Sequence, residues 1–375
     1  MSLNKNQQTF FALVKAGLWE QEVRLSQYNG IDYEALMQLA EEQAVVGLVT
    51  VGLKHIIDVR ISQEYLLEFI GQSLQIEKQN LSQNEFVARL IEKLHKEEIY
   101  ALLVKGQGIA QCYEKPLWRC SGDVDLFIKD KSYQKAIKYL SSIASSVEDE
   151  KKYYQHLAMT IDGWTVEPHG TLRSGLWRSI DRALDKVQSA VFYEGKVRSW
   201  QDGRTQVFLP KADEDVVFVF SHILQHFFKE GIGLRQICDW CRLLWRYGSE
   251  LDLRLLESRI HEMGVMTEWK SFAALVVDYL GMPIEAMPFY SSQKRWKKKA
   301  DKIVAFVIET GSFGHNRDYS YYENYPYIIF KAISLWKHLV DTYTYCMIFP
   351  LDSIKVFMRR LTVGFSIAIQ GKRHE

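Results

Sequence analysis

The feature that most constrains the fold of this 375-residue chain is a change of hydrophobic pattern at residue 99. Before it, apolar residues recur at helical spacing with few breakers, which predicts a helical region over 1–98. Short apolar runs of strand length follow at residues 100–104 and 124–128. Apolar runs of helical length return after residue 211 and continue to the end of the chain. The pattern predicts an α/β block between two helical regions.

The α/β block should contain a small mixed sheet over residues 99–210. Two further strand-like runs, 153–161 and 164–172, are joined by Asp162-Gly163, a pair typical of tight hairpin turns. Pro168 favours an edge position for the second of them, because proline donates no ladder hydrogen bond. A helix is expected over 131–144 and another strand over 205–209. The predicted fold class is therefore α/β plus α, with helical regions over 1–98 and 211–375.

Composition excludes several classes of protein. The chain carries 47 basic and 46 acidic residues, and this balance makes nucleic acid an improbable partner for the molecule as a whole. Five cysteines in so long a chain do not form a disulfide framework. The first residues lack the apolar core of a signal peptide, and no uncharged apolar stretch reaches the length of a membrane helix. We expect a reduced, cytoplasmic protein with no membrane partner.

The residues that point to chemistry are Asp123 and Asp125. Residues i and i+2 of a strand point the same way, so these carboxylates should lie side by side and repel each other. A divalent cation relieves that repulsion, and Mg²⁺ prefers one or two carboxylates while leaving positions for phosphate oxygens. The pair therefore predicts an Mg²⁺ or Mn²⁺ site for a nucleoside triphosphate. The alternative is a solvated strand edge with no ligand.

A third carboxylate should complete a two-metal site, and Glu167 is the candidate because its strand could lie beside that of Asp125. It would hold the second metal or accept the proton of an attacking hydroxyl. A solvent-facing hairpin glutamate is the alternative. His169 shares the face of Glu167, and a structural or substrate-side role for it is favoured over catalysis.

Four residues ahead of the carboxylates are candidate nucleotide contacts. Lys105 and Gly106 end the first strand, where a glycine lets backbone N–H groups approach phosphate. Arg119 and Ser121 could hold triphosphate or substrate oxygens. For Lys105, a surface lysine is an equal alternative.

These residues together resemble a known family. Lys105-Gly106, Tyr113-x-x-Pro116, Arg119 and the run from Gly122 to Ile128 resemble the uncharacterised bacterial nucleotidyltransferases of the DNA polymerase β superfamily. Glu167-Pro-His169 is similar to that family's later acidic strand, and His222 with the stretch 233–239 is similar to its helical domain. The resemblance is strongest over 100–172 and continues loosely to about 244.

The resemblance implies metal-dependent transfer of a nucleoside monophosphate from a nucleoside triphosphate, ATP first among them, to an unknown hydroxyl-bearing acceptor. The chain departs from the pattern of the superfamily at Gln107, a position where other members have a serine that contacts phosphate. The alternative is thus a catalytically degenerate protein of the same fold that binds a nucleotide or a partner.

Four other motifs favour structural roles. Cys238-x-x-Cys241 lies in an apolar helix without a second cysteine pair, so core packing is expected. His222 and His226 have zinc-ligand spacing without the glutamate of His-Glu-x-x-His, so packing or lining of a cleft is expected. The basic run Lys294–Lys299 favours a solvated helix face, with nucleic-acid binding through Trp296 as the alternative. The glycine-rich segment 311–317 is expected to be an interhelical loop.

Overall fold

The structure is a computed structural model that describes residues 3–28, 30–148, 155–229, 231–312 and 342–369, together with residues 333, 336, 339 and 340. Within these residues, no helix combines the length and the apolar character needed to cross a lipid bilayer. Most of the loop expected at 311–317 lies outside the described residues.

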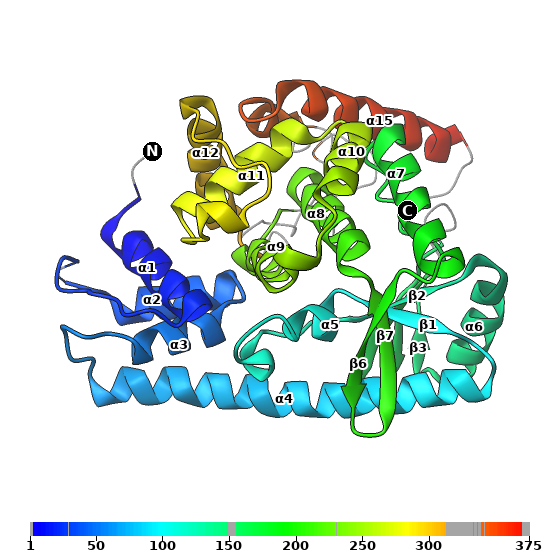
Figure 1. The fold of residues 1–375 in the computed structure, drawn as a ribbon, viewed down its shortest axis with the longest axis horizontal. Helices are drawn as coiled ribbons and strands as arrows, with labels where there is room; N and C mark the ends of the chain where they lie inside the picture. The colour runs from blue at the N-terminus through cyan, green and yellow to red at the C-terminus, as the bar shows by residue number, and fades with distance from the viewer. Residues whose placement is uncertain are drawn as a thin grey trace.

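The N-terminal part is helical, as the sequence predicts (Figure 1). Its helices are α1 (Lys5–Trp19), α2 (Tyr33–Glu42), α3 (Val46–Lys54) and α4 (Gln63–Lys96). A capping box between Asn4 and Gln7 starts α1, and the Ser62 side chain caps α4. The 34-residue α4 extends beneath both the N-terminal helices and the sheet in Figure 1.

A five-stranded mixed sheet follows, with strand order β1-β2-β5-β4-β3. Its strands are β1 (Ala101–Val104), β2 (Val124–Ile128), β3 (Ser146–Val147), β4 (Met159–Ile161) and β5 (Trp164–His169). Only β2 and β5 pair in parallel; the other neighbours are antiparallel. The turn between β4 and β5 has positive φ angles at both Asp162 and Gly163, as the sequence pattern predicts.

The prediction of an edge position for Pro168 was wrong. β5 lies inside the sheet, between β2 and β4. β4 pairs only with Trp164–Val166, so Pro168 lies beyond the last residue of that ladder. An interior strand therefore tolerates the proline because its neighbour on one side is too short to need the missing donor.

The helices between and after the strands are α5 (Gly106–Ala110), α6 (Asp130–Ile143), α7 (Arg178–Tyr193), α8 (Ala212–Lys229), α9 (Leu234–Tyr247), α10 (Leu253–Met263), α11 (Met266–Asp278), α12 (Lys294–Thr310) and α15 (Pro350–Ile369). A separate hairpin, β6 (Val197–Asp202) and β7 (Thr205–Pro210), follows α7. Of these, α7 and β6 were not predicted from the sequence.

The two faces of the sheet belong to different hydrophobic cores. Val124, Leu126 and Ile128 pack with the C-terminal half of α4, α6 and β7. Phe127 joins the larger core, which contains the N-terminal helices and α7 to α12. Because side chains alternate along a strand, Asp125 points to the same side as Phe127, toward the helical region. The chemistry therefore lies where the sheet meets the C-terminal helices.

Candidate active site

Two parallel strands bring the predicted carboxylates together. Asp125 in β2 stands opposite Glu167 in β5 in the strand register, and Asp123 lies one residue before β2 begins. All three line one cavity of about 420 Å³ between the sheet and α8 and α9. The cavity therefore lies where the sheet meets the C-terminal helices.

Asp125 is buried and fully engaged. The Lys105 Nζ and the His169 Nε2 each lie 2.8 Å from its Oδ1 atom. Burial alone would raise the pKa of Asp125, but the Lys105 ammonium and the His169 hydrogen bond outweigh it and lower the pKa to about 2. Asp125 is therefore ionised at any physiological pH.

Glu167 is held by a pair of histidines. His156 Nε2 lies 2.9 Å and His169 Nε2 lies 3.8 Å from Glu167 Oε2. The two imidazole rings stack, with centroids 4.7 Å apart. Burial opposes ionisation of Glu167, yet the hydrogen bond from His156 lowers its pKa below the ordinary value. The potential ligand atoms of this trio lie within 4.8 Å of one another, a spacing that could hold a metal ion.

Asp123 differs from the other two carboxylates because it has no hydrogen-bond or ion-pair partner among the described residues. Burial raises its pKa above the ordinary value, and the negative charges of Glu167 and Asp125 raise it further. Three carboxylates thus share a cavity in which the cationic partners reach only two of them. This is the arrangement that a divalent cation relieves.

The backbone at the end of β1 aims Lys105 into the cavity. Lys105 has φ of 58° and ψ of −146°, a conformation that non-glycine residues rarely adopt. Gly106 follows with φ of 45°. Strained residues of this kind persist when the surrounding structure fixes them, and they concentrate at functional sites. Both residues line the cavity, as expected for nucleotide contacts.

The departure at Gln107 has a structural explanation. Gln107 is buried, and its amide donates to Asn80 Oδ1 at 2.7 Å and Gln83 Oε1 at 2.6 Å, both on α4. Asn80 and Gln83 in turn donate to backbone carbonyls of the segment 117–122, which leads into Asp123. The side chain at this position therefore fixes the loop before the carboxylates to α4 and does not face the cavity.

Arg119 lies at the cavity wall, but its donors are occupied. Its Nε and Nη2 atoms each lie 2.7 Å from a different oxygen of Asp239 on α9, and Tyr113 donates to the same carboxylate at 2.8 Å. Burial disfavours the charge of Arg119, yet Asp239 outweighs it and raises its pKa. Ser121 is not among the described residues that line the cavity. The role expected of Arg119 and Ser121 as direct triphosphate contacts stays a prediction.

The opposite wall of the cavity comes from α8 and α9. His222, His226, Lys229 and Arg235 all line it. The Nε2 atoms of His222 and His226 are 2.9 Å apart, so one ring donates to the other. Burial and then the Lys105 charge hold the pKa of His222 well below its usual range. The expected cleft-lining role of the two histidines agrees with this position.

Arg235 is a cavity residue that the sequence did not single out. Its Nη1 donates to the carbonyls of Cys120 and Ser121, just before Asp123. Burial and then the nearby Arg119 charge lower the pKa of Arg235 from its ordinary value. Nothing local in the sequence distinguishes it from other helical arginines. His156 was missed for the same reason, since only the fold places it beside Glu167.

The remaining motifs take structural roles. Cys238 and Cys241 are fully buried in α9, as predicted. Trp296, in the basic run that begins α12, is buried, so the alternative in which it stacks on a nucleic-acid base was wrong. Lys297 of the same run pairs with Asp278 at 3.5 Å.

One comparison with known proteins found a family match. A family model described as "Uncharacterised nucleotidyltransferase" matches residues 29–281, which is more than half of the chain. The match extends from the loop before α2 to the end of α11 and includes the whole cavity described above. Searches of curated proteins and of solved structures returned no significant match.

Proposed function

The chain belongs to this family of uncharacterised nucleotidyltransferases, and from that premise we propose that it transfers a nucleoside monophosphate from a nucleoside triphosphate, ATP being the first candidate, to a hydroxyl-bearing acceptor. The observation that carries the proposal is the convergence of Asp123, Asp125 and Glu167 on one cavity, with Asp123 left without a cationic partner.

The residues present fit a divalent cation. Asp123, Asp125 and Glu167 offer carboxylate oxygens, which are the ligands that Mg²⁺ and Mn²⁺ prefer. Burial, and then the negative charges of Glu167 and Asp125, raise the pKa of Asp123, so a bound cation would favour its ionised form. A bound cation would neutralise charge on the triphosphate and on the attacking and leaving oxygens.

The chain's own cations would position the triphosphate. Lys105 and Gly106 lie at one side of the cavity, and Arg235 lies at the other. Lys105 now pairs with Asp125 at 2.8 Å, and it would contact phosphate once that carboxylate is otherwise balanced. Arg119, through its bidentate pair with Asp239, would hold the segment that carries Ser121 and Asp123 in place. Catalysis would then rest on alignment and on charges fixed before the reaction.

The proposed reaction is a substitution at the α-phosphorus of the nucleoside triphosphate. The acceptor oxygen forms a bond to the α-phosphorus, the bond between the α-phosphorus and the bridging oxygen to the β-phosphate breaks, and pyrophosphate leaves. The acceptor's hydroxyl proton passes to Glu167, which already accepts a hydrogen bond from His156. In this role Glu167 would act as the base, and completing a second metal site is its alternative role.

A transfer assay tests the proposal. The protein is incubated with each α-labelled nucleoside triphosphate, Mn²⁺ and a cell extract, and the labelled fraction is identified. We expect Asp123→Asn and Asp125→Asn to lower labelling by at least roughly 100-fold, as loss of fixed transition-state charge does elsewhere. Full labelling by both variants would rule out the carboxylate site.

A binding module without turnover is the second candidate. It is favoured by one observation: Gln107 is turned into the network with Asn80 and Gln83, away from the cavity. Calorimetry with ATP separates the two candidates. Tight, Mg²⁺-dependent binding without transfer to any fraction would favour the binding module.

A further inference from the structure

A second cavity, of about 880 Å³, lies beside the candidate active site. Arg173 lines both cavities, so the two are neighbours at the segment that follows β5. The second cavity lies between α7 and α15, and we call it the arginine groove. Its described lining residues are Arg173, Leu176, Trp177, Arg178, Asp181, Arg182, Asp185, Lys355, Met358 and Arg359.

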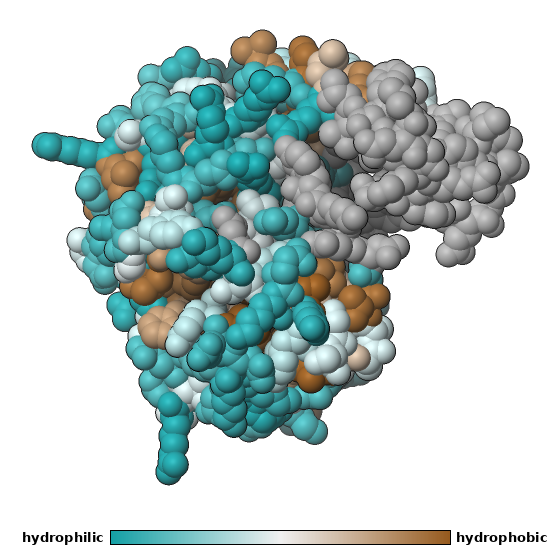
Figure 2. Space-filling view, turned by 90° about the vertical axis from the view of Figure 1, so that its right-hand side faces the viewer, coloured by the Kyte–Doolittle hydropathy of each residue, from teal (hydrophilic) through white to brown (hydrophobic). Residues whose placement is uncertain are grey.

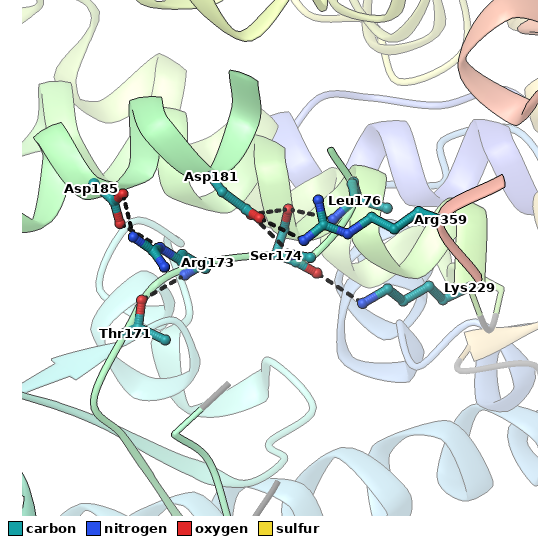
Figure 3. Close-up of polar contacts among 9 residues, drawn as sticks. Thr171, Arg173, Ser174, Leu176, Asp181, Asp185, Lys229 and Arg359 are labelled. Carbon is teal, nitrogen blue, oxygen red and sulfur yellow. Dashed lines mark hydrogen bonds and ion pairs between the residues drawn. The ribbon is translucent and has the colours of Figure 1, made fainter. Parts of the chain in front are cut away.

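The two carboxylates of the arginine groove are already balanced (Figure 3). Asp185 accepts two hydrogen bonds from Arg173, at 2.8 and 2.7 Å. Asp181 accepts from Arg359 at 3.1 Å and from the Gly175 backbone at 3.0 Å. These contacts hold the segment 173–175 against α7 and hold α7 against α15, so the wall shared by the two cavities is fixed.

The same segment is tied to the wall of the active cavity. Lys229 of α8 donates to the Ser174 carbonyl at 2.8 Å, as Figure 3 shows. Thr171 Oγ1 accepts from the Arg173 backbone at 3.3 Å. The segment between His169 and α7 therefore has partners on both of its sides. A ligand that lies across it would contact a surface whose conformation is already fixed.

Two arginines of the groove have no such balance. Arg178 and Arg182 are exposed, lie four residues apart on α7, and have no partner among the described residues. Like charges at this spacing repel each other. Arg178 is also the first residue of the helix, where a cation is disfavoured by the helix dipole. Within the described part of the chain no side chain forms an ion pair with either arginine, whereas a bound anion would.

The chemistry of these side chains specifies the anion. Guanidinium groups bind phosphate and carboxylate with two parallel hydrogen bonds, and four of the groove's five cations are arginines. A phosphate monoester carries a charge of about −1.5 to −2 at neutral pH, which matches the two unbalanced guanidinium groups. Figure 2 views the molecule from the side on which α7 lies in Figure 1. The described part of that face is mainly hydrophilic, with scattered apolar side chains.

We propose that the arginine groove binds the acceptor substrate and that this acceptor carries a phosphate monoester held by Arg178 and Arg182. Its hydroxyl would reach the carboxylates past Arg173. That the bound molecule is an acceptor rests on the proposed function, whereas binding of a phosphate monoester in the groove does not. The proposal narrows the acceptor from any hydroxyl compound to a phosphorylated one.

Calorimetry with glycerol 2-phosphate, which carries both a phosphate monoester and hydroxyl groups, tests the site directly. We expect the wild type to bind it and Arg178→Gln/Arg182→Gln to bind it at least tenfold more weakly. The matched control is Arg60→Gln/Arg204→Gln, which removes two exposed arginines outside both cavities and should bind like the wild type. Melting temperatures without ligand show that both variants fold.

Binding of ATP with Mg²⁺ is measured in parallel, because it reports on the active cavity. The groove variant should retain it, and glycerol 2-phosphate should bind in its presence. Competition between the two ligands would place the phosphate in the nucleotide site and overturn the proposal. The proposal would also be overturned if the wild type bound ATP but did not bind glycerol 2-phosphate, and that outcome would leave the proposed function intact. Absence of ATP binding counts against the proposed function, and the glycerol 2-phosphate result then decides the groove alone.

A single-stranded RNA is the last probe. If the wild type bound the RNA but not glycerol 2-phosphate, and the groove variant weakened RNA binding, the groove would be a nucleic-acid surface and the proposal would fail.

Discussion

The carboxylates show what a sequence can say about a site at the scale of single residues. The i, i+2 spacing of Asp123 and Asp125 predicts a shared direction, and a neighbouring strand carrying Glu167 was the natural third contributor. The structure places all three around one cavity. Their role as metal ligands stays a prediction. The sequence places His169 on the face of Glu167, but it does not predict the pairing of Lys105 and His169 with Asp125 or of His156 with Glu167, because only the fold brings these side chains together.

Arg119 illustrates the same limit from the other side. Its sequence position suggests a phosphate contact, but its partner, Asp239, lies 120 residues further along the chain. Both side chains are almost fully buried, with exposed fractions of 6% each. Only the packing of α9 against the loop before β2 creates this pair, and no local sequence pattern predicts it.

Two bidentate arginine–aspartate pairs make a test of burial. Asp239→Asn leaves Arg119 buried without its counter-charge, and we expect it to lower the free energy of unfolding by about 3–5 kcal/mol. Asp185→Asn breaks the Arg173 pair, whose side chains are 46% and 39% exposed, and should cost no more than about 1 kcal/mol. Urea unfolding measures both. Equal losses would mean that the buried pair is not what fixes the loop.

Among the elements, the strands and the longest helices were the best predicted. Short apolar runs between glycine-rich breaks predict β1 and β2, and Asp162-Gly163 predicts the β4–β5 hairpin. The position of β5 was not predictable, since strand order depends on which partners reach it. α7 was missed, although it supplies one side of the arginine groove.

The packing of α1 on α3 depends on glycines at the contact. A Cβ atom at Gly52 would lie 2.1 Å from the Leu13 carbonyl oxygen, a backbone atom that cannot yield. We expect Gly52→Ala to lower the free energy of unfolding by about 1–3 kcal/mol or more, as overpacking does. Gly71→Ala, on an open face of α4, is the matched control and should stabilise by up to about 1 kcal/mol. Thermal or urea unfolding distinguishes them by sign.

Glu268, at the contact between α11 and α15, should make the stability of the folded chain depend on pH. Glu268 of α11 is fully buried, and burial and then the nearby Asp352 of α15 raise its pKa well above the ordinary 4.5. Above about that pH the unfolded chain ionises Glu268 while the folded chain keeps it protonated, so this group lowers stability as pH rises. Glu268→Gln removes the dependence and should raise the melting temperature more at pH 8 than at pH 5.

The control for that experiment is Glu257→Gln, an exposed glutamate of α10. It should leave the difference in melting temperature between the two pH values unchanged. An equal effect of Glu268→Gln at pH 5 and pH 8 would contradict the assignment of a protonated buried carboxyl group.

For the whole molecule, the division into three parts over 1–98, 99–210 and 211–375 stays a prediction. The larger hydrophobic core contains residues from all three parts, from Phe10 to Val356. A hydrophobic pattern marks where helices and strands begin, but it does not say which of them share a core. The sequence therefore predicts the kinds of structure better than their association.

Ligand binding should stabilise the whole molecule. A ligand that binds only the folded chain adds about 2.7 kcal/mol at a concentration 100 times its Kd. We expect ATP with Mn²⁺ to raise the melting temperature, EDTA to abolish the rise, and Asp123→Asn to show none. The variant itself should melt no lower than the wild type, because it removes a carboxylate whose ionisation is disfavoured by burial and then by the charges of Glu167 and Asp125. Equal stabilisation of wild type and variant would remove Asp123 from the site.

Helix α4 has a consequence for how this chain can be divided. Asn80 and Gln83 are the only described partners of the Gln107 side chain, and they hold the carbonyls that precede Asp123. Residues Phe86 to Leu94 cover one face of the sheet. A fragment beginning at the first strand would lose those hydrogen bonds and expose that face to water. The shortest active form of the chain should therefore start before residue 62, well outside the strands that carry the carboxylates.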